Sequence, residues 1–275
     1  MPSSINTNVP AMYATQNLSK TQEQLQMSQT RIATGQKVAN AKDNGAIFAI
    51  AQVQRATSSG LNAVRESLQR GQSTADVSIA AGETISDLLV QMKEKALAAS
   101  DVQLNSSSRA AMAADFASLR DQIRNASEQT SFNGASLISS TATNITALAD
   151  DTGTRVITIQ AQRLNLGGGN VQVLATTTIG TRSLATQALS LVNTSIQRVS
   201  LALAKLGTGS KALYTHMNFV NKLQDAVDAG VGNIVDADLA KEGARLQSLQ
   251  TKEQLGYQAL SIANQGPSSL LSLFR

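Results

Sequence analysis

The stretch from Ile47 to Ala99 decides the fold. It reads IFAIAQVQRATSSGLNAVRESLQRGQSTADVSIAAGETISDLLVQMKEKALAA. Its spacing places one narrow apolar stripe along a helix, and a stripe of this length needs partner helices to cover it. The stretch therefore predicts a long helix over about residues 44–100. The stripe consists of apolar residues that recur mostly in steps of three and four around polar gaps: Ile47, Ile50, Leu61, Val64, Leu68, Ala75, Ile85, Leu89, Met92, Ala96 and Ala99.

A second stretch further along the chain repeats the pattern. It predicts a helix over about residues 185–234, with Gly207 and Gly209 as its weakest points because glycine is a poor helix former. Two such stripes imply that the flanks of the chain return to each other. The predicted fold class is mainly α, a long antiparallel coiled-coil helical rod formed by both chain ends. The second stripe consists of Leu189, Val192, Ile196, Val199, Leu203, Leu206, Leu213, Met217, Val220, Val227, Val231 and Ile234.

The two ends of the chain carry weaker helical patterns. Residues 4–33 place Leu18, Leu25 and Ile32 at intervals of seven among mostly polar neighbours. So few apolar side chains do not offset the entropy of ordering the first 43 residues on their own. We therefore expect this end to fold only when another surface covers it. The last predicted helix follows residues 236–238 and carries Leu239, Leu246, Leu249, Leu255, Leu260 and Ile262.

Polar breaks separate the helical segments. Residues 35–45 have a glycine at each end and predict an extended connector, after which Asp43 or Asn44 is expected to cap the long helix. A second break covers residues 101–108, where Ser106 to Ser108 are expected to cap a return helix. That helix ends before Phe132 and carries Met112, Phe116, Leu119, Ile123 and Ala126 on one face.

The middle of the chain abandons the helical period. Between about residues 135 and 184, two short segments alternate apolar and polar residues, Arg155 to Gln160 and Asn170 to Leu174. Gly167 to Gly169 separates them. This pattern predicts a small excursion built on a β-hairpin.

Composition narrows the classes of function. The chain has no Trp, three Tyr and five Phe, which argues against a thick globular core. It has no cysteine and therefore no disulfide or thiolate metal site. No apolar run is long enough to span a membrane, and residues 1–6 do not resemble a signal peptide. The net charge of +4 comes from both signs interspersed along the helices, so nucleic acid is not an expected partner.

The sequence offers no clear catalytic or cofactor site. The single histidine, His216, stands beside the stripe residue Met217 and cannot supply a metal-binding pair. Asp236 and Asp238 suit a turn and a helix cap better than a cation site. Gly167 to Gly169 lacks the lysine and hydroxyl residue that follow a phosphate-binding loop. We therefore expect neither an enzyme nor a bound cofactor.

Several motifs together resemble bacterial flagellin, and in particular the compact flagellins of alphaproteobacteria. The resemblance covers both flanks and spares the middle. The motifs are Ser4 to Asn8, Arg31 to Val38 followed by Ala41 to Asn44, Thr130 to Gly134, Ala259 to Gln265, and Leu271 to Arg275.

The resemblance implies a structural subunit that polymerises into the extracellular flagellar filament for swimming motility. It implies an inner coiled-coil domain of residues 1–43 with 236–275, and an outer helical rod domain of residues 44–235. The implied partners are other flagellin subunits, the filament cap and hook-junction proteins, and the flagellar export apparatus with its chaperone. By family position, the candidate polymer contacts are Leu18, Leu25, Ile32, Leu246, Leu249, Leu260, Leu273 and Phe274.

Two other functions stay open on the sequence. A hook-filament junction protein has similar ends, and a helical nucleic-acid or secretion-system binding module would suit the basic charge. The resemblance also implies that the middle excursion can carry O-linked glycans. The candidate acceptors are Ser139, Ser140, Thr141, Thr143, Thr146, Thr176, Thr177 and Thr178.

Overall fold

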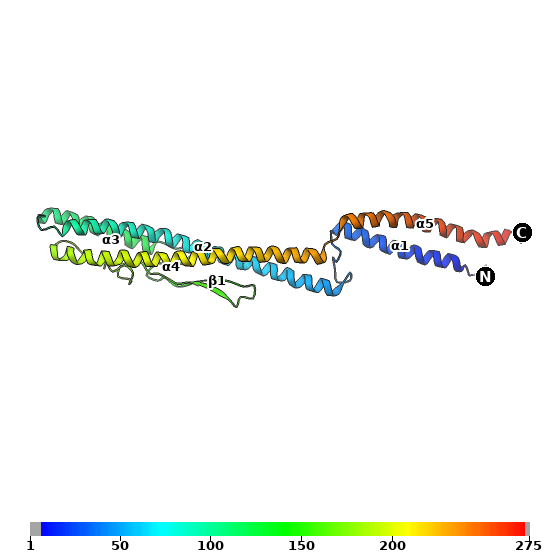
Figure 1. Cartoon of the computed structure of the whole chain (residues 1–275), viewed down its shortest axis with the longest axis horizontal. Helices are drawn as coiled ribbons and strands as arrows, with labels where there is room; N and C mark the ends of the chain where they lie inside the picture. The colour runs from blue at the N-terminus through cyan, green and yellow to red at the C-terminus, as the bar shows by residue number, and fades with distance from the viewer. Residues whose placement is uncertain (1–6, 273–275) are drawn as a thin grey trace. The chain divides into compact units, whose positions relative to one another are not determined.

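The computed structural model describes residues 7–272, and for residues 266–272 it describes the helical backbone alone. The chain forms two compact units, residues 1–56 with 226–275, and residues 57–225. The mainly α fold class is confirmed (Figure 1). In chain order, the elements of the described part are α1 (Val9–Thr34), α2 (Gly45–Ala99), α3 (Ser106–Glu128), β1 (Ile145–Leu148), β2 (Val156–Ile159), α4 (Arg182–Val235) and α5 (Leu239–Ser272).

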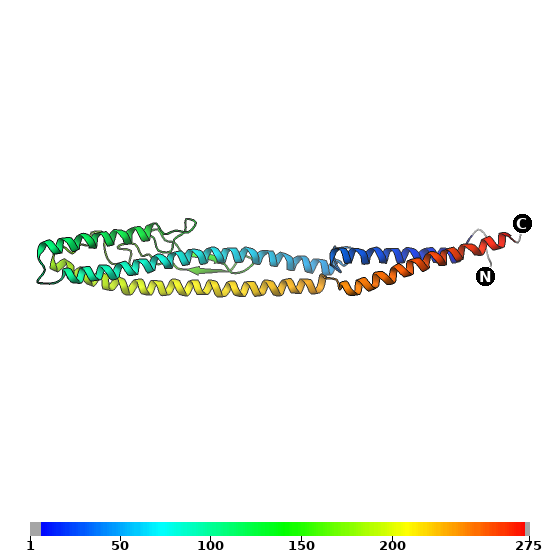
Figure 2. The same ribbon diagram turned by 90° about the horizontal axis from the view of Figure 1, so that it is seen from above.

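Three helices build the unit of residues 57–225, where α3 runs beside the end of α2 and both lie along α4 (Figure 2). The predicted stripes face this core, because every stripe residue of α2 from Leu61 to Ala99 is buried. From α4, five stripe residues are buried in it: Val192, Val199, Leu206, Leu213 and Val220. The return helix adds Phe116 and Ile123, both fully buried. Burial of the stripes is therefore what assembles this unit.

The small β-hairpin predicted in the middle of the chain is confirmed, but residues 170–174 are not one of its strands. β2 matches the first predicted segment, but it pairs antiparallel with β1, from Ile145 opposite Ile159 to Leu148 opposite Val156. The Asp150 side chain closes the turn between the strands, since it accepts hydrogen bonds from the backbone N–H groups of Thr154 (3.0 Å) and Arg155 (3.3 Å). This turn joins β2 to the segment before it rather than to the segment after it.

Residues 170–174 form no strand, because their backbone N–H and C=O groups hydrogen-bond to a side chain and to a neighbouring turn instead of to a partner strand. Gln172 N–H donates to the buried hydroxyl of Ser195 on α4 (2.8 Å), and the carbonyls of Val171 and Val173 both accept from Gly167 N–H at 3.0 Å. Val171 and Val173 are fully buried in the core. This segment is therefore a loop packed on α4. Its apolar and polar residues alternate because its side chains are alternately buried and more exposed.

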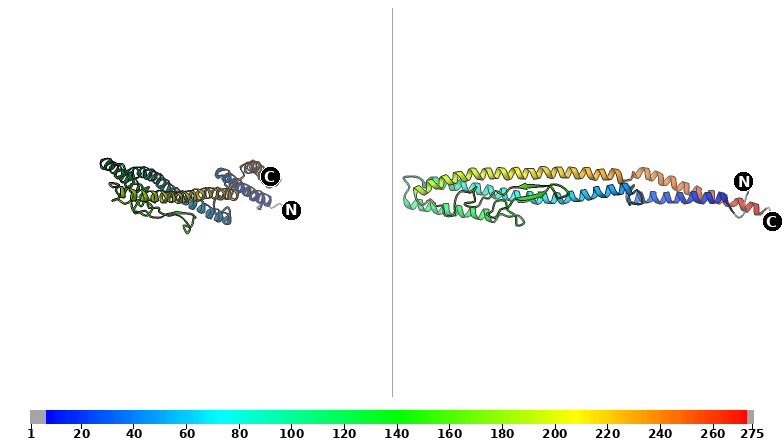
Figure 3. Two further views of the ribbon diagram at one scale, coloured as in Figure 1. Left: turned by 60° about the vertical axis from the view of Figure 1, so that its left-hand side comes forward. Right: turned by 90° about the horizontal axis from the view of Figure 1, so that it is seen from below.

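Helix α4 continues without a break through Gly207 and Gly209, contrary to the expected weakness there. A Cβ at position 209 would lie 3.1 Å from two side-chain atoms of Ile159. Glycine here therefore permits close packing of β2 on α4. Figure 3 shows the hairpin running alongside these helices.

Backbone hydrogen bonds at the ends of the helices hold the connectors of the other unit. Gly35 has a φ of +69° and ends α1, and its carbonyl accepts from Ala237 N–H at 2.9 Å. Lys37 N–H donates to the Val235 carbonyl (2.7 Å). The two connectors, residues 35–44 and 236–238, therefore lie side by side between the helices that they join.

A side-chain cap begins each of the five helices of the described part, including Asn8 before α1 and Thr181 before α4. Asn44 accepts from Ile47 N–H and caps α2, while Asp238 accepts from Lys241 N–H and caps α5, as expected for both. The cap of α3 was placed wrongly. Asn105, and not the serines that follow it, accepts from Ser108 N–H at 2.7 Å.

Candidate assembly surface

Helices α1 and α5 pack on each other as an antiparallel pair, called here the terminal helix pair (Figure 1). At one end, Ser28 contacts Glu242. At the other, the Asn8 side-chain amide donates to the Ala263 carbonyl at 2.9 Å. The sequence pattern of residues 18–32 thus finds its partner helix within the same chain.

The residues predicted as polymer contacts are buried to different extents in the subunit. Leu18 and Leu249 are buried, whereas Leu25, Ile32, Leu246 and Leu260 are half-buried. The other two candidates, Leu273 and Phe274, lie outside the described residues. The terminal helix pair therefore covers some of these side chains only partly.

The terminal helix pair also exposes large apolar side chains that sequence reasoning did not select as contacts. Ile262 is 69% exposed and Leu255 is 56% exposed. Their spacing of seven residues places them on one face of α5. This spacing is the feature of the sequence from which they could have been selected. The other exposed large apolar side chains of the pair are Val9, Met12, Tyr13 and Met27 on α1, and Leu239 and Tyr257 on α5.

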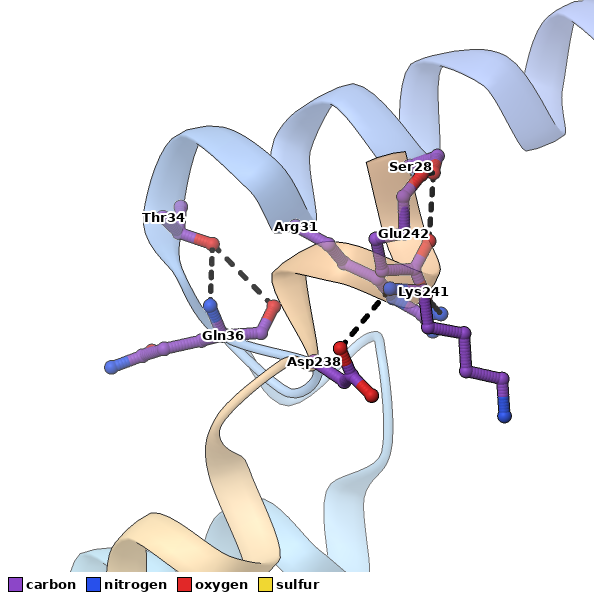
Figure 4. A network of polar contacts seen from close by, with 7 residues as sticks. All are labelled: Ser28, Arg31, Thr34, Gln36, Asp238, Lys241 and Glu242. Carbon is purple, nitrogen blue, oxygen red and sulfur yellow. Dashed lines mark hydrogen bonds and ion pairs between the residues drawn. The ribbon is translucent and has the colours of Figure 1, made fainter. Parts of the chain in front are cut away.

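A polar cluster of Ser28, Arg31 and Glu242 lies inside the seam of the terminal helix pair, where α1 ends and α5 begins (Figure 4). The Ser28 hydroxyl donates to Glu242 Oε2 at 2.7 Å, and Arg31 Nη1 lies 3.2 Å from Oε1. The Glu242 side chain is only 12% exposed. The Ser28 hydroxyl and then Arg31 and Arg245 lower the pKa of the Glu242 carboxyl, although burial opposes them.

The candidate glycan acceptors differ in access. Ser139 is buried, and Thr177 is half-buried with its hydroxyl accepting from Leu174 N–H at 2.9 Å. The remaining six candidates are exposed. They lie in two groups, residues 140–146 and residues 176–178.

The residues considered for chemistry have structural contacts. His216 Nε2 lies 2.8 Å from the Ala149 carbonyl and so ties α4 to the end of β1. A hollow of about 440 Å³ lies between β2 and α4. Lys205 is the one ionisable residue among those that line it. Within residues 7–272, no group of three or more His, Cys, Asp or Glu side chains is placed to hold a metal ion. No helix in that range is long and apolar enough to cross a membrane.

Comparisons with known proteins match both flanks of the chain. Residues 5–143 match the bacterial flagellin N-terminal helical region, and residues 189–274 match the bacterial flagellin C-terminal helical region. The unmatched interval, residues 144–188, holds the hairpin and the packed loop.

Full-length relatives are similar along the whole chain. Flagellin FljK of Caulobacter vibrioides is 55% identical over 272 residues, which cover 99% of this chain and 98% of the relative. A flagellin of Brucella melitensis is 31% identical over 99% of both chains.

Solved structures share the fold. The crystal structure of Bacillus cereus flagellin matches 56% of this chain and 88% of its own, with a TM-score of 0.50 and 22% identity. A putative flagellar hook-associated protein from Vibrio parahaemolyticus matches 70% of this chain and all of its own, with a TM-score of 0.55 and 14% identity. By its sequence, this chain belongs to the bacterial flagellin family and is a structural, non-enzymatic subunit that polymerises into the extracellular flagellar filament.

Proposed function

We propose that the terminal helix pair is the part of this flagellin that joins subunits in the filament. Its exposed apolar side chains carry the proposal. Among the described side chains of the pair, eight large apolar residues are at least 47% exposed, on two helices that pack on each other. Exposed apolar surface gathered in this way is typical of a binding surface.

The proposal assigns residues 1–43 with 236–275 to an inner domain and residues 44–235 to an outer one. The inner packing contacts would be Leu18, Leu25, Ile32, Leu246, Leu249, Leu260, Leu273 and Phe274. Burial of Leu18 and Leu249 supports a role inside the helix pair. Half-burial of Leu25, Ile32, Leu246 and Leu260 leaves each of them surface for a neighbouring subunit.

Limited proteolysis of soluble monomer and of filament tests the assignment. We expect a mild protease to remove both ends from the monomer, leaving a fragment near residues 44–235, and to leave the filament intact. Deleting residues 270–275 removes three leucines and a phenylalanine, together about 6 to 12 kcal/mol of potential burial. We expect this truncation to abolish seeded assembly without unfolding the fragment near 44–235. A monomer protected from end to end, or normal filaments from the truncated chain, would contradict the proposal.

The further partners follow from the same assignment. We infer that an export apparatus with a chaperone carries the chain, that a cap protein guides its addition to the filament tip, and that hook-junction proteins bind the first subunits. Ends that fold only on assembly are suited to export as an unfolded chain. Co-purification of monomer, but not of filament, with a chaperone from the same cell would support the chaperone.

We also propose O-linked modification of the exposed hydroxyls of the middle segment: Ser140, Thr141, Thr143, Thr146, Thr176 and Thr178. Their exposure supports access by a transferase. The test is the intact mass of subunits from native filaments, with peptide mapping of any added mass. A mass equal to that of the bare chain excludes the modification.

A further inference from the structure

The polar cluster adds little stability to the terminal helix pair compared with apolar residues of the same size. Glu242 and Arg31 are largely removed from solvent, with side chains 12% and 23% exposed. Arg31 Nε is buried without a hydrogen-bond partner in the described part of the chain. Such a group is expensive to bury, and a buried ion pair adds little stability over apolar residues of the same size. The cluster therefore calls for a role other than stability.

The apolar contacts of the terminal helix pair do not by themselves define its register. Leu18, Leu25 and Ile32 are seven residues apart, and Leu246 and Leu260 are two such intervals apart. The position between them is Glu253, so a slip of α5 along α1 by seven residues keeps the heptad positions aligned without placing a leucine opposite every leucine. Helix pairs with a regular heptad pattern are prone to this ambiguity unless a buried polar residue breaks it.

The polar cluster does not survive that slip. Ser28 would be replaced opposite Glu242 by Thr21 or Gly35, and Arg31 by Gln24 or Val38. In neither case does α1 offer a cation at the position of Arg31. The Glu242 carboxylate, only 12% exposed, would then lose its ion pair with Arg31 and keep only the weaker attraction of Arg245, which is unfavourable.

We propose that Ser28, Arg31 and Glu242 fix the register of the terminal helix pair, so that subunits in the filament present one alignment of α1 and α5. The inference rests on the proposed function, because it concerns the pair as it exists in the polymer. Glu242 is the central member, since its two oxygens separately bind the other two residues. These are positioning residues for assembly.

One contact provides a reporter of the register. A Cβ at position 256 would lie 3.9 Å from Leu18 Cβ, within the range of roughly 3.5–4.5 Å that a disulfide needs. The chain has no cysteine of its own. Leu18→Cys with Gly256→Cys therefore reports the observed register, and Leu25→Cys with Gly256→Cys reports a slip of seven residues.

The experiment compares oxidative cross-linking in assembled filaments of both reporter pairs. Non-reducing electrophoresis separates intramolecular from intersubunit bonds. With the native cluster, we expect the 18–256 bond and little 25–256 bond. In Glu242→Ala, we expect the ratio of the two yields to fall about tenfold, since a hydrogen-bonded charge is lost. Glu23→Ala, at an exposed carboxylate of α1, is the matched control and should leave the ratio unchanged.

A charge exchange keeps the test decisive if single variants assemble poorly. Arg31→Glu combined with Glu242→Arg restores an ion pair in the observed register and should recover the 18–256 bond, whereas either change alone should not. An unchanged ratio in Glu242→Ala, or failure of the exchange to recover what the single changes lose, overturns the register role. A 25–256 bond in place of the 18–256 bond in filaments with the native cluster also overturns it, whereas absence of both bonds would contradict the proposed function, because the helix pair would not exist in the polymer.

Discussion

Gly209 of α4 lies against Ile159 of β2: a Cβ at position 209 would meet both Ile159 Cγ1 and Cγ2 at 3.1 Å. Ile159 is 3% exposed and has little room to move. Gly209→Ala gains up to about 1 kcal/mol in helix propensity but pays about 1–3 kcal/mol for overpacking. We expect it to lower the free energy of unfolding of the unit formed by residues 57–225, measured by urea unfolding of the monomer.

Gly207 supplies the matched control two residues away. It lies on the same helix, and a Cβ there would meet nothing within 4 Å. Gly207→Ala should therefore keep the propensity gain of up to about 1 kcal/mol and stabilise the monomer. Equal effects of the two substitutions would show that the contact with Ile159 does not constrain position 209.

Asp150 should hold the turn of the hairpin. Its carboxylate accepts from the hydroxyls of Thr154 (2.8 Å) and Thr152 (3.0 Å), besides two backbone N–H groups. The Thr154 hydroxyl is the main reason that the pKa of Asp150 is lowered. We expect Asp150→Ala to loosen the turn and to speed tryptic cleavage after the exposed Arg155, followed by mass spectrometry. Asp151→Ala keeps the Cβ that packs on Gly60 and should cleave at the native rate.

The fold could be predicted where burial follows the helical period. The predicted bounds of α2 lie within one residue of the observed ones. The reason is that its apolar stripe runs unbroken from Leu61 to Ala99 and polar residues follow it. The pairing of β1 with β2 could not be predicted, because four hydrogen bonds to one side chain, Asp150, decide it. The loop at Val171 and Val173 alternates like a strand, but the hydroxyl of Ser195 takes the place of a partner strand.

The surface proposed for assembly could be predicted only partly from the sequence. Leu18 and Leu25 stand at an interval of seven and are buried and half-buried, but the same interval at Leu255 and Ile262 marks exposed side chains. A helical period states which residues share a face and not which face is covered within the subunit. The polar cluster gave no signal, since Ser28 and Glu242 are far apart in sequence and ordinary in composition.

Glu242 should make the terminal helix pair sensitive to acid. Its pKa lies below the ordinary value of 4.5 in the folded pair, so its stabilisation is complete above that pH and is lost as the pH falls through the lowered folded-state pKa. The charged groups that act on it are Arg31 and Arg245. We expect filament dissociation below about pH 4.5 to depend less steeply on pH in Glu242→Gln. Light scattering across pH 2–6 measures this, and identical profiles for the two proteins would exclude a contribution from Glu242.

Leu255 and Ile262 should be needed for assembly but not for folding of the subunit. Both side chains are more than half exposed on α5, so a lysine there costs little in the free subunit. Buried against a neighbouring subunit, the same lysine would be an unpaired charge in an apolar contact. We expect Leu255→Lys and Ile262→Lys each to prevent seeded polymerisation, scored by electron microscopy and sedimentation, while circular dichroism shows an unchanged unfolding transition. Ile262→Val keeps an apolar side chain and should polymerise normally. Native-like filaments from both lysine variants would show that this stripe faces solvent in the filament.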